Sequence, residues 1–466
     1  MTKVVLFNSP INNEKKDVLE MSGSYPRIGI ASIAAYLLKK GIEVNIIDPN
    51  AEKLNVEKIK NKISKLNPDI VGFPAFTEEI HNTAYTAKII KEVNQEITTV
   101  IGGPHASAIP IETLQEFDSF DIAVYGEGES TFYDVVLKKN LDHIEGIAFK
   151  EGNDIKLNIN RSLIPNLDTL PFPAWHLYDL DNYKGRSLIS GFGMKGRDLE
   201  LPVESARGCP FDCVFCYRVC GKSIRFKSPE KVADEVERNV TEFGANRIHF
   251  VEGTFGVNKN LAKEMCSELI KRNLHNKITW SSGGRVNVLD KELLSIMKES
   301  GCVYLGFGVE SGDNEILKTI KKGITTQQIE KIFKLCKQVG IKTEANFIIG
   351  HPYETEETVL KTIEFAKKLK ADHATFAILV PFPGTEVRKM AEKAIGGLKI
   401  ISNDWSIYGK QIGGSLELDQ LPLKKIIDLQ AKAYKEFYLR PSKLLGFVSR
   451  LSLKRVVYGI KRIVDW

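Results

Sequence analysis

Three cysteines stand close together near the middle of the chain, within the stretch Glu-Ser-Ala-Arg-Gly-Cys-Pro-Phe-Asp-Cys-Val-Phe-Cys-Tyr at residues 204–217. Cys209, Cys213 and Cys216 follow the order C-x3-C-x2-C, and a glycine and a proline beside the first cysteine favour a turn. A disulfide needs two cysteines, and a tetrahedral zinc site normally needs four ligands. Three thiolates suit an iron–sulfur cubane, whose fourth iron then stays open for a small chelating ligand.

Two other interpretations of the triplet exist. It could be a zinc knuckle that borrows a distant fourth ligand, or three incidental buried thiols. Cys220 could supply a fourth ligand and would then close the open iron. We favour the cluster, because the triplet follows a strand-like run and heads a long α/β pattern, and we interpret Cys220 as a bystander.

The length and the cysteine usage limit the class of protein. A chain of 466 residues with 43% hydrophobic and 27% charged residues is typical of a soluble protein of two or three domains. Apart from the triplet, the cysteines are spread singly, which argues against a secreted disulfide framework and indicates a reducing cytoplasm. The apolar run Val-Val-Leu-Phe near the N-terminus is too short for a signal peptide. No stretch approaches the roughly 20 apolar residues of a membrane span.

The net charge of +6 is concentrated at the C-terminal end. Residues 440–466 hold seven Lys or Arg against one acid, Asp465, so their balance of 7 − 1 = +6 equals that of the whole chain. The rest is formally neutral, which argues against nucleic acid as a partner, because nucleic-acid binding needs a basic face on the folded body.

Residues 1–150 alternate short apolar runs with helical segments. The expected strands are Lys3–Asn8, Glu43–Asp48, Asp69–Pro74 and Thr98–Gly102, and the expected helices are Gly29–Lys40, Val56–Leu66 and Ile80–Glu92. This pattern predicts a doubly wound, flavodoxin-like (Rossmann-type) parallel sheet, whose ligands bind at the loops after the strands. Two such loops are rich in glycine: Gly-Gly-Pro-His-Ala-Ser at 102–107 and Tyr-Gly-Glu-Gly-Glu at 125–129.

A linker is expected at residues 151–195, because residues 164–175 are rich in proline. Residues 196–395 then predict a partial (β/α)6 TIM-like barrel, with its active site at the C-terminal ends of the strands. The strands are expected at Leu201–Ala206, Arg247–Glu252, Ile278–Gly283, Tyr304–Glu310, Thr343–Ile349 and Ala374–Val380, each followed by a helix. The α/β fold class follows from these two units.

A C-terminal region is expected at residues 396–466. Its first part includes Trp405 and Tyr408, which we interpret as candidate linings of a substrate cavity, and a helix is expected at Leu423–Tyr438. Beyond Pro441, apolar residues recur at helical spacing with lysines and arginines on much of the other face. Such a basic amphipathic helix suits the surface of an anionic membrane, although docking onto the protein's own body fits the pattern equally well.

The cysteine triplet resembles that of the radical S-adenosylmethionine (AdoMet) enzymes. In that family the open iron binds the methionine part of AdoMet, and an electron from the [4Fe-4S] cluster cleaves AdoMet to a 5′-deoxyadenosyl radical. The glycine loops, the strand order and the proline-rich linker resemble the cobalamin-binding domain and connector of one large subgroup. The resemblance covers about residues 1–395.

The resemblance implies a set of cofactor contacts, and two positions depart from the family's motifs. The expected AdoMet contacts are Phe215, Glu252, Gly253, Ser281, Arg285, Glu310, Ser311, Gly350 and Pro381, and the expected cobalamin contacts are Thr77, Gly102, Gly103, Pro104, His105, Gly126 and Glu127. Val251 replaces the first glycine of the family's Gly-Gly-Glu-like motif. The loop after the first strand reads Asn-Ser-Pro-Ile-Asn-Asn at residues 8–13 and lacks the histidine that ligates cobalt in many cobalamin domains. His105 is a candidate ligand, but the favoured interpretation is a contact with the nucleotide tail or solvent.

The reaction that the resemblance implies is methylation of an unactivated carbon, in which a second AdoMet re-methylates cobalamin. The alternative is a radical oxidation or ring formation, as in the anaerobic porphyrin-ring cyclases of the same subgroup. A methylthiotransferase is disfavoured, because it needs a second cysteine triplet, and a cobalamin sensor has no use for an open iron. The expected partners are a small-molecule or lipid substrate, an external electron donor (flavodoxin or ferredoxin) and an anionic membrane surface, with the protein cytoplasmic or bound peripherally to a membrane. The sequence names no catalytic residue.

Overall fold

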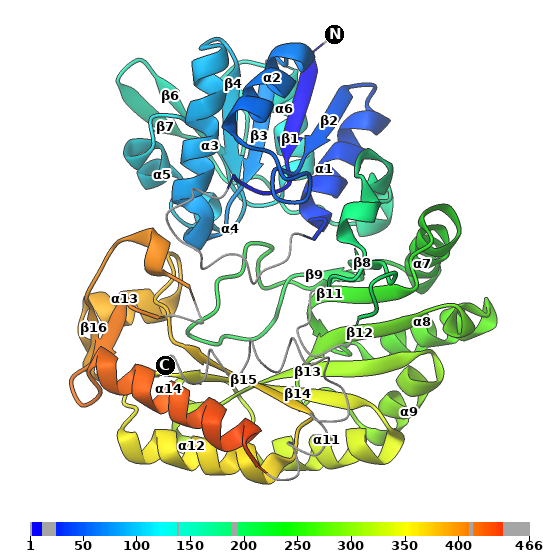
Figure 1. Cartoon of the computed structure of the whole chain (residues 1–466), viewed down its shortest axis with the longest axis vertical. Helices are drawn as coiled ribbons and strands as arrows, with labels where there is room; N and C mark the ends of the chain where they lie inside the picture. Colours follow the sequence, from blue (N-terminus) through cyan, green and yellow to red (C-terminus); the bar gives the residue numbers. More distant parts are fainter. Residues whose placement is uncertain (1, 12–24, 138, 188–193, 410–412, 441–466) are drawn as a thin grey trace.

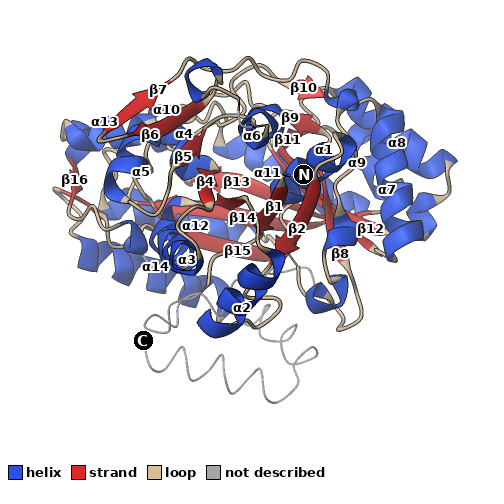
Figure 2. Ribbon diagram, turned by 90° about the horizontal axis from the view of Figure 1, so that it is seen from above, coloured by secondary structure: helices blue, strands red, loops and turns tan. Residues whose placement is uncertain are grey.

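The computed structural model describes residues 2–11, 25–137, 139–187, 194–409 and 413–440. Two α/β units are stacked, with the N-terminal unit above the larger C-terminal unit and the segment that contains β9 passing between them (Figure 1). Seen from above, the N-terminal strands lie over the strands of the second sheet (Figure 2).

The first sheet has the strand order β2-β1-β3-β4-β5-β6-β7. Its strands are β1 (Lys3–Phe7), β2 (Glu43–Ile47), β3 (Ile70–Pro74), β4 (Thr98–Gly102), β5 (Ile122–Val124), β6 (Ile147–Glu151) and β7 (Asp154–Leu157). The neighbours from β2 to β5 pair in parallel, which confirms the flavodoxin-like sheet. The covering helices are α1 (Ile28–Lys39), α2 (Val56–Leu66), α3 (Ile80–Val93), α4 (Pro104–Ala108), α5 (Pro110–Glu116) and α6 (Gly128–Val136).

The strands β6 and β7 form an antiparallel hairpin that the sequence analysis does not include. Glu151 pairs with Asp154, so two residues, of which Gly152 has a φ of +60°, make the turn. Because of this hairpin, the first sheet extends to Leu157, beyond residue 150, at which the domain was expected to end.

The second sheet has the strand order β15-β14-β13-β12-β11-β8, and all its neighbours are parallel. Its strands are β8 (Glu200–Val203), β11 (Arg247–Phe255), β12 (Thr279–Gly284), β13 (Cys302–Glu310), β14 (Lys342–Ile349) and β15 (His373–Ile378). The helices along it are α7 (Pro229–Phe243), α8 (Lys259–Lys271), α9 (Lys291–Glu299), α10 (Asn314–Thr319), α11 (Thr326–Val339), α12 (Glu356–Leu369) and α13 (Glu386–Glu392). Six parallel strands with helices between them confirm the partial barrel.

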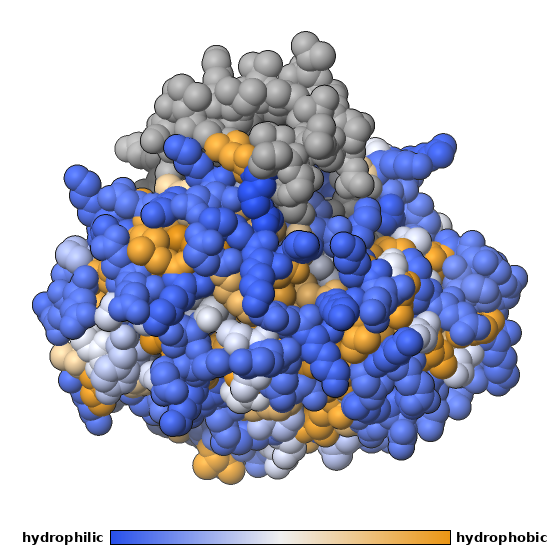
Figure 3. Space-filling model, turned by 90° about the horizontal axis from the view of Figure 1, so that it is seen from below, coloured by the Kyte–Doolittle hydropathy of each residue, from blue (hydrophilic) through white to orange (hydrophobic). Residues whose placement is uncertain are grey.

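An N-cap residue and buried cysteines stabilise the barrel unit. Asp290 accepts a hydrogen bond from the backbone N of Leu293 at 2.9 Å, so it is the N-cap of α9. Cys266, Cys302 and Cys336 are fully buried in the core. Seen from below, the surface is mainly hydrophilic with small scattered hydrophobic patches (Figure 3).

The open edge of the barrel is covered by α14 (Leu423–Tyr438). Tyr434 and Tyr438 accept hydrogen bonds at 3.1 Å from the backbone N atoms of Phe376 and Ala374 in β15. Gln430, one turn earlier, donates to the carbonyl of Phe376 at 2.7 Å. Side chains of one helix face thus satisfy the backbone of an edge strand that lacks a neighbouring strand on this side.

The remaining C-terminal segments pack partly against the barrel helices α13 and α14 and partly, at residues 405–407, against α3 of the N-terminal unit. The strands β16 (Leu398–Ile400) and β17 (Leu416–Leu418) form a small antiparallel pair. Trp405 and Tyr408, the expected linings of a substrate cavity, are buried among the core residues of the first sheet, and their role toward a substrate stays a prediction. Residues 441–466, for which a basic amphipathic helix is expected, lie outside the described residues. Within the described part of the chain, no helix is long and apolar enough to cross a membrane.

Candidate functional site

The cysteine loop joins two short antiparallel strands, β9 (Ala206–Arg207) and β10 (Arg225–Phe226). Gly208 has a φ of +94°, and a Cβ there would lie 2.3 Å from the carbonyl oxygen of Ser223, so only glycine fits this crossing. The backbone N of Cys209 donates to Gly221 at 3.2 Å, which closes the loop on itself. Another bond, from the N of Val214 to the carbonyl of Ile320 at 3.2 Å, fixes the loop to the barrel.

The three thiols of the triplet lie near one another and are free. All seven cysteines are unpaired. Burial raises the pKa of the Cys216 thiol, and the neighbouring Cys213 and Cys209 thiols raise it further. Among the described residues, no group of three or more His, Cys, Asp or Glu side chains converges as the ligands of a single metal ion would. The ligands of a four-iron cluster lie further apart, because each thiolate binds a different iron.

Arg285 reaches the cysteine loop from the end of β12. Its Nη1 lies 3.3 Å from the Sγ of Cys213, and its guanidinium lies 3.7 Å from the centre of the Phe211 ring. Its Nη2 donates to the carbonyl of Lys322. A cation fixed beside a cysteine sulfur stabilises negative charge there.

Glu310 and Lys322 form a buried ion pair at the end of β13. The Nζ of Lys322 lies 2.6 Å from the Oε1 of Glu310, and both side chains are 7% exposed. The same Nζ lies 5.8 Å from the ring centre of Phe215 in the cysteine loop. Lys322 is not predicted from the sequence as a site residue, because nothing in its local sequence shows that it pairs with a residue twelve positions earlier.

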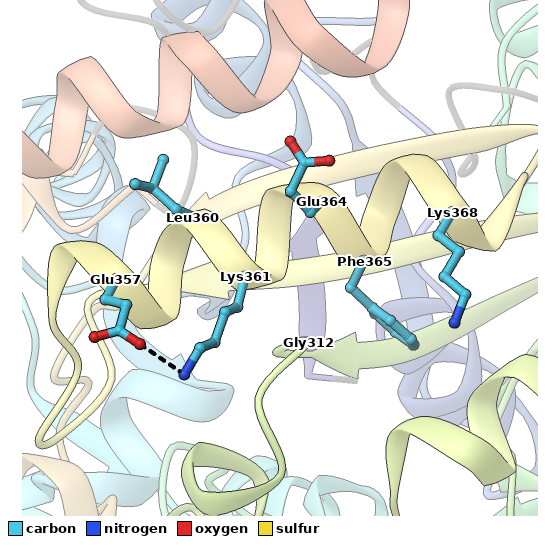
Figure 4. Close-up of a pocket in the computed structure, with 7 residues that line it drawn as sticks. All are labelled: Gly312, Glu357, Leu360, Lys361, Glu364, Phe365 and Lys368. Atoms are coloured by element: carbon cyan, nitrogen blue, oxygen red, sulfur yellow. Dashed lines mark ion pairs between the residues drawn. The ribbon is translucent and has the colours of Figure 1, made fainter.

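Ser311 and Gly312 join the end of β13 to α12 rather than to the mouth of the barrel. The Oγ of Ser311 lies 3.1 Å from the Oγ1 of Thr362, and Ser311 is fully buried. A Cβ on Gly312 would lie 2.5 Å from the Cβ of Phe365, so glycine permits the close contact with α12. A hollow beside this contact is lined by α12 side chains, among them Lys361 and Glu357, which form an exposed ion pair at 2.9 Å (Figure 4).

Glu252 is a buried carboxyl with one unsatisfied oxygen. Its Oε2 accepts a hydrogen bond from the Oγ of Ser205 at 2.7 Å, whereas its Oε1 has no partner. Burial raises the pKa of Glu252 to about 7. Gly253 follows it in β11. A buried acceptor without a partner is costly, which favours a cationic ligand at this point.

Ser281 lies within the barrel and contacts a histidine. Its Oγ lies 2.9 Å from the Nδ1 of His249, and burial lowers the pKa of His249 to about 4. The hydroxyl is therefore engaged with the protein, and its expected role toward AdoMet stays a prediction.

The loop after β14 surrounds a second unsatisfied carboxyl. The backbone N atoms of Gly350 and His351 donate to the Oε2 of Glu354 at 2.6 and 3.0 Å, and the Oε1 of Glu354 has no partner. The fully buried ring of His351 lies 5.9 Å from the ring of Phe215. Pro381, after β15, is also buried. Gly350, Phe215 and Pro381 therefore belong to one end of the barrel.

The glycines in the two glycine-rich loops of the N-terminal unit differ in the space around them. A Cβ on Gly103 would lie 2.9 Å from the carbonyl oxygen of Ala75, so this glycine serves the fold, and Pro104 begins α4 directly after it. Gly126 has a φ of +79° and open space where a Cβ would stand, and Gly102 makes only ordinary contacts. The backbone at these two positions can be approached closely by a ligand.

Thr77 and His105 face each other inside the N-terminal unit. The Nδ1 of His105 lies 3.3 Å from the Oγ1 of Thr77, and the imidazole meets the ring of Trp405 edge-on at 5.3 Å. Burial lowers the pKa of His105 to about 4. His105 is fully buried and Thr77 is 5% exposed, so neither side chain is presented at a surface.

The loop after β1, where the family's histidine is absent, is held by a buried polar network. Asp48 accepts hydrogen bonds from the Nδ2 of Asn8 at 2.7 Å and from the Oγ of Ser9 at 2.6 Å. Tyr183 of the linker donates to the same carboxylate at 2.6 Å, and Tyr178 donates to Asn8 at 3.0 Å. The loop therefore anchors the linker.

Glu127 belongs to a buried charge cluster between the two units. Arg207, two residues before Cys209, contacts Glu127 at 3.3 Å, Glu129 at 2.6 Å and Glu204 at 2.8 Å. The second cation, Arg225, contacts Glu127 at 2.9 Å. These five residues form the interdomain charge cluster. The Glu127 carboxylate is thus engaged between the domains, and its contact with cobalamin stays a prediction.

The cysteine loop also meets the glycine-rich loop after β4. The hydroxyl of Tyr217, the residue after Cys216, donates to the carbonyl of Ser107 at 2.7 Å. A Cβ on Gly384, after β15, would lie 2.6 Å from the Tyr217 ring and 3.1 Å from the Cβ of Ala108. Three segments converge here: the cysteine loop, the end of β15 and the loop after β4.

Comparisons with known proteins agree with this arrangement. A model described as the radical SAM superfamily matches residues 203–366, and one described as a B12 binding domain matches residues 15–136. The chain is 36% identical to an uncharacterized methyltransferase of Pyrococcus horikoshii, over 99% of this chain and 98% of that protein. It is 30% identical to an anaerobic magnesium-protoporphyrin IX monomethyl ester cyclase of Cereibacter sphaeroides, over 78% of this chain and 60% of that protein.

A solved structure shares the fold of almost the whole chain. A radical S-adenosylmethionine methyltransferase from Kitasatospora setae, with tryptophan substrate and a SAM analog bound, superposes with a TM-score of 0.72 at 17% identity. The superposition covers 95% of this chain and 90% of that one.

Proposed function

We propose a reaction for this chain on the premise that it belongs to the radical SAM superfamily, in the group that carries a B12 binding domain ahead of the barrel. It is an enzyme that uses a [4Fe-4S] cluster, AdoMet and cobalamin, and the reaction that we infer is methylation of an unactivated carbon of a small molecule. When bound, the three groups supply a 5′-deoxyadenosyl radical and a transferable methyl group.

One observation carries this proposal. The loops at the carboxyl ends of the two parallel sheets face each other, and Tyr217 and the interdomain charge cluster join them within a few residues of Cys209 and Cys216. Ligands of parallel sheets bind at the carboxyl ends of the strands. A substrate between the loops would therefore touch both cofactors, as a methyl transfer to a substrate radical requires.

The residues present fit the three groups. Cys209, Cys213 and Cys216 would hold the cluster, and the unpartnered Oε1 of Glu252 would accept a hydrogen bond from the AdoMet ammonium group. The open backbone at Gly102 and Gly126 leaves room for cobalamin. The remaining expected contacts stay predictions.

The chain's own groups would bind, orient and shield the reactants. Arg285 holds positive charge beside Cys213, and Lys322 places a second buried cation beside Phe215. Burial of Glu310, Lys322 and His351 excludes water from this end of the barrel, which strengthens electrostatic interactions there.

A ring-forming oxidation is the second candidate, and the 30% identity to the cyclase favours it. The two candidates differ in how they consume AdoMet. A methylation uses one AdoMet as radical source and one as methyl donor, whereas a radical oxidation uses it only as radical source.

AdoMet product analysis separates the two candidates. Anaerobically reconstituted protein with cobalamin, a chemical reductant and AdoMet labelled in its methyl group should form S-adenosylhomocysteine together with 5′-deoxyadenosine, and the label should move to cobalamin. Formation of 5′-deoxyadenosine alone, with no label on cobalamin, would favour the oxidation and overturn the methylation.

Two partners are proposed on sequence grounds alone. An external flavodoxin or ferredoxin would reduce the cluster. Residues 441–466, with their excess of basic side chains, would attach the protein to an anionic membrane surface and bring it near a lipid substrate. Co-sedimentation with anionic and neutral vesicles tests the second proposal, because attachment should need the anionic lipid, weaken with salt and disappear when the chain ends before Pro441.

A further inference from the structure

The concave face of the barrel is partly accessible. Along β12 to β15, residues that point outward are buried under the helices, for example Phe307, Phe347 and Phe376. Residues that alternate with them are part-exposed, for example Gly306, Asn346 and Thr375. Because the outer face is covered, this alternation means that the inner face borders accessible space.

Two glycines lie side by side on this inner face. Gly283 of β12 pairs with Gly306 of β13, and neither has a φ in the left-handed region. A Cβ on Gly283 would meet nothing within 4 Å, and one on Gly306 would meet nothing closer than 3.7 Å. Glycine within a strand costs stability relative to other residues. Neither the backbone conformation nor the packing of the protein explains the two glycines.

The next glycine along β13 is different. A Cβ on Gly308 would lie 2.4 Å from the Oε1 of Glu310 and 2.7 Å from the Nζ of Lys322. Gly308 is thus explained by the Glu310–Lys322 pair, and among the glycines of β12 and β13 only Gly283 and Gly306 present bare backbone without an internal reason.

Two polar groups border this bare backbone. The Nδ2 of Asn346 lies 3.7 Å, and the Oε2 of Glu344 lies 4.0 Å, from the position that a Cβ of Gly306 would take. Thr375 donates to the Oδ1 of Asn346 at 2.6 Å, which leaves the Nδ2 as a donor. Tyr304 donates to the Oε2 of Glu344 at 3.0 Å, and a carboxyl oxygen can accept a second hydrogen bond.

We propose that Gly283, Gly306, Asn346 and Glu344 form the substrate subsite and that it takes a flat ring system whose edge carries both a hydrogen-bond acceptor and a donor. A planar ring can lie against the bare backbone of two adjacent glycines. Its acceptor would pair with the Asn346 amide and its donor with the Glu344 carboxyl. A purely apolar chain would cover both polar groups and leave them unpaired, which is unfavourable.

This subsite rests on the proposed function, and pterin is the probe that tests it. Pterin is a fluorescent flat bicycle with adjacent N–H and C=O groups on its edge. Fluorescence anisotropy with the reconstituted holoenzyme should show binding that n-decanol does not displace.

Gly306→Val fills the bare patch and should abolish binding, and Asn346→Leu should weaken it about tenfold, as the loss of one hydrogen bond does. Gly196→Val, at another glycine with open space around it, is the matched control and should bind normally.

Thermal unfolding distinguishes a ligand role from a structural one. Because strand glycines cost stability, Gly306→Val should unfold at a temperature no lower than wild type. A lower midpoint would mean that the fold needs this glycine and would overturn the argument. Absence of pterin binding to wild type, displacement by n-decanol, or equal binding by Gly306→Val would overturn the subsite. Loss of AdoMet affinity in Gly306→Val would assign the patch to the AdoMet site and overturn it equally. Failure of wild type to cleave AdoMet would instead overturn the proposed function and leave the pterin result to stand by itself.

Discussion

Glu252 carries the clearest sign, at the scale of single residues, that a charged ligand belongs in this barrel. The residue is half-buried, one carboxyl oxygen is held by Ser205, and the other is buried and has no partner. A carboxyl in such a place keeps its proton more readily than in water, and its pKa rises to about 7. An ammonium group at the unpartnered oxygen would stabilise the ionised form.

The affinity for AdoMet should therefore depend on pH. Below pH 7 the free protein holds a proton on Glu252 that binding must release, so affinity should rise by up to about tenfold per pH unit toward neutrality and then level off. Isothermal titration of the reconstituted protein between pH 6 and 8 measures this. Glu252→Gln should bind more weakly and without this dependence. An affinity of wild type that does not change with pH would contradict the assignment.

Iron content tests the role of each cysteine. Burial raises the pKa of the Cys220 thiol to about 11. The backbone carbonyl of Cys220 accepts a hydrogen bond from Arg225. We expect about four irons per chain in wild type and in Cys220→Ala, the content of one cubane. Replacement of Cys209, Cys213 and Cys216 by Ala should abolish iron binding. Loss of iron in Cys220→Ala would mean that the fourth iron is not open.

At the scale of elements, hydrophobic periodicity and turn residues predict the parallel strands and most helices to within a few residues. The helices α2 and α14 begin and end at the expected residues, because strong amphipathic patterns and the residues that stop helices mark them. The hairpin of β6 and β7 is missing from the prediction, since its short strands, five and four residues long, carry little periodicity. The pairing of α14 with the edge of β15 depends on three-dimensional contact and has no local signal.

The pairing of α14 with β15 can be tested by removing one hydroxyl. Tyr434→Phe keeps the ring but leaves the backbone N of Phe376 without its acceptor. The free energy of unfolding should fall by about 1 kcal/mol, measured by urea denaturation. Lys424→Ala, an exposed change on the same helix, is the control. Equal stability of Tyr434→Phe and wild type would show that the hydroxyl is not needed at this edge.

At the scale of the whole molecule, the interdomain charge cluster joins the two units beside the cysteine loop. Burial alone would lower the pKa of the Arg207 guanidinium, but the Glu129 and Glu204 carboxylates outweigh it and raise the pKa. Removing one partner from a buried pair leaves an uncompensated charge, so Glu129→Ala should destabilise the protein by about 3 kcal/mol. Glu357→Ala, at the exposed pair of Figure 4, should leave the unfolding midpoint unchanged. Similar midpoints for the two variants would show that the cluster does not hold the domains together.

Site residues could be predicted from the sequence only where the residues that carry the chemistry lie in one short segment. The cysteine triplet and the candidates Glu252, Arg285 and Glu310 come from motifs at strand ends. The contact between Glu129 and Arg207 joins residues 78 positions apart, and the partners His249 and Ser281 are 32 positions apart. Such contacts form only when the strands and the two sheets assemble, so the spacing of residues in the chain does not predict them.

We propose that the two units bring the cluster and cobalamin face to face. Electron paramagnetic resonance of the reconstituted protein, with the cluster reduced and cobalamin in its Co(II) state, tests this directly. We expect the two paramagnetic centres to broaden and split each other's signals, and we expect the cobalamin signal to become that of an isolated centre when Cys209, Cys213 and Cys216 are replaced by Ala. Two independent, unperturbed signals in wild type would contradict this arrangement of the two cofactors.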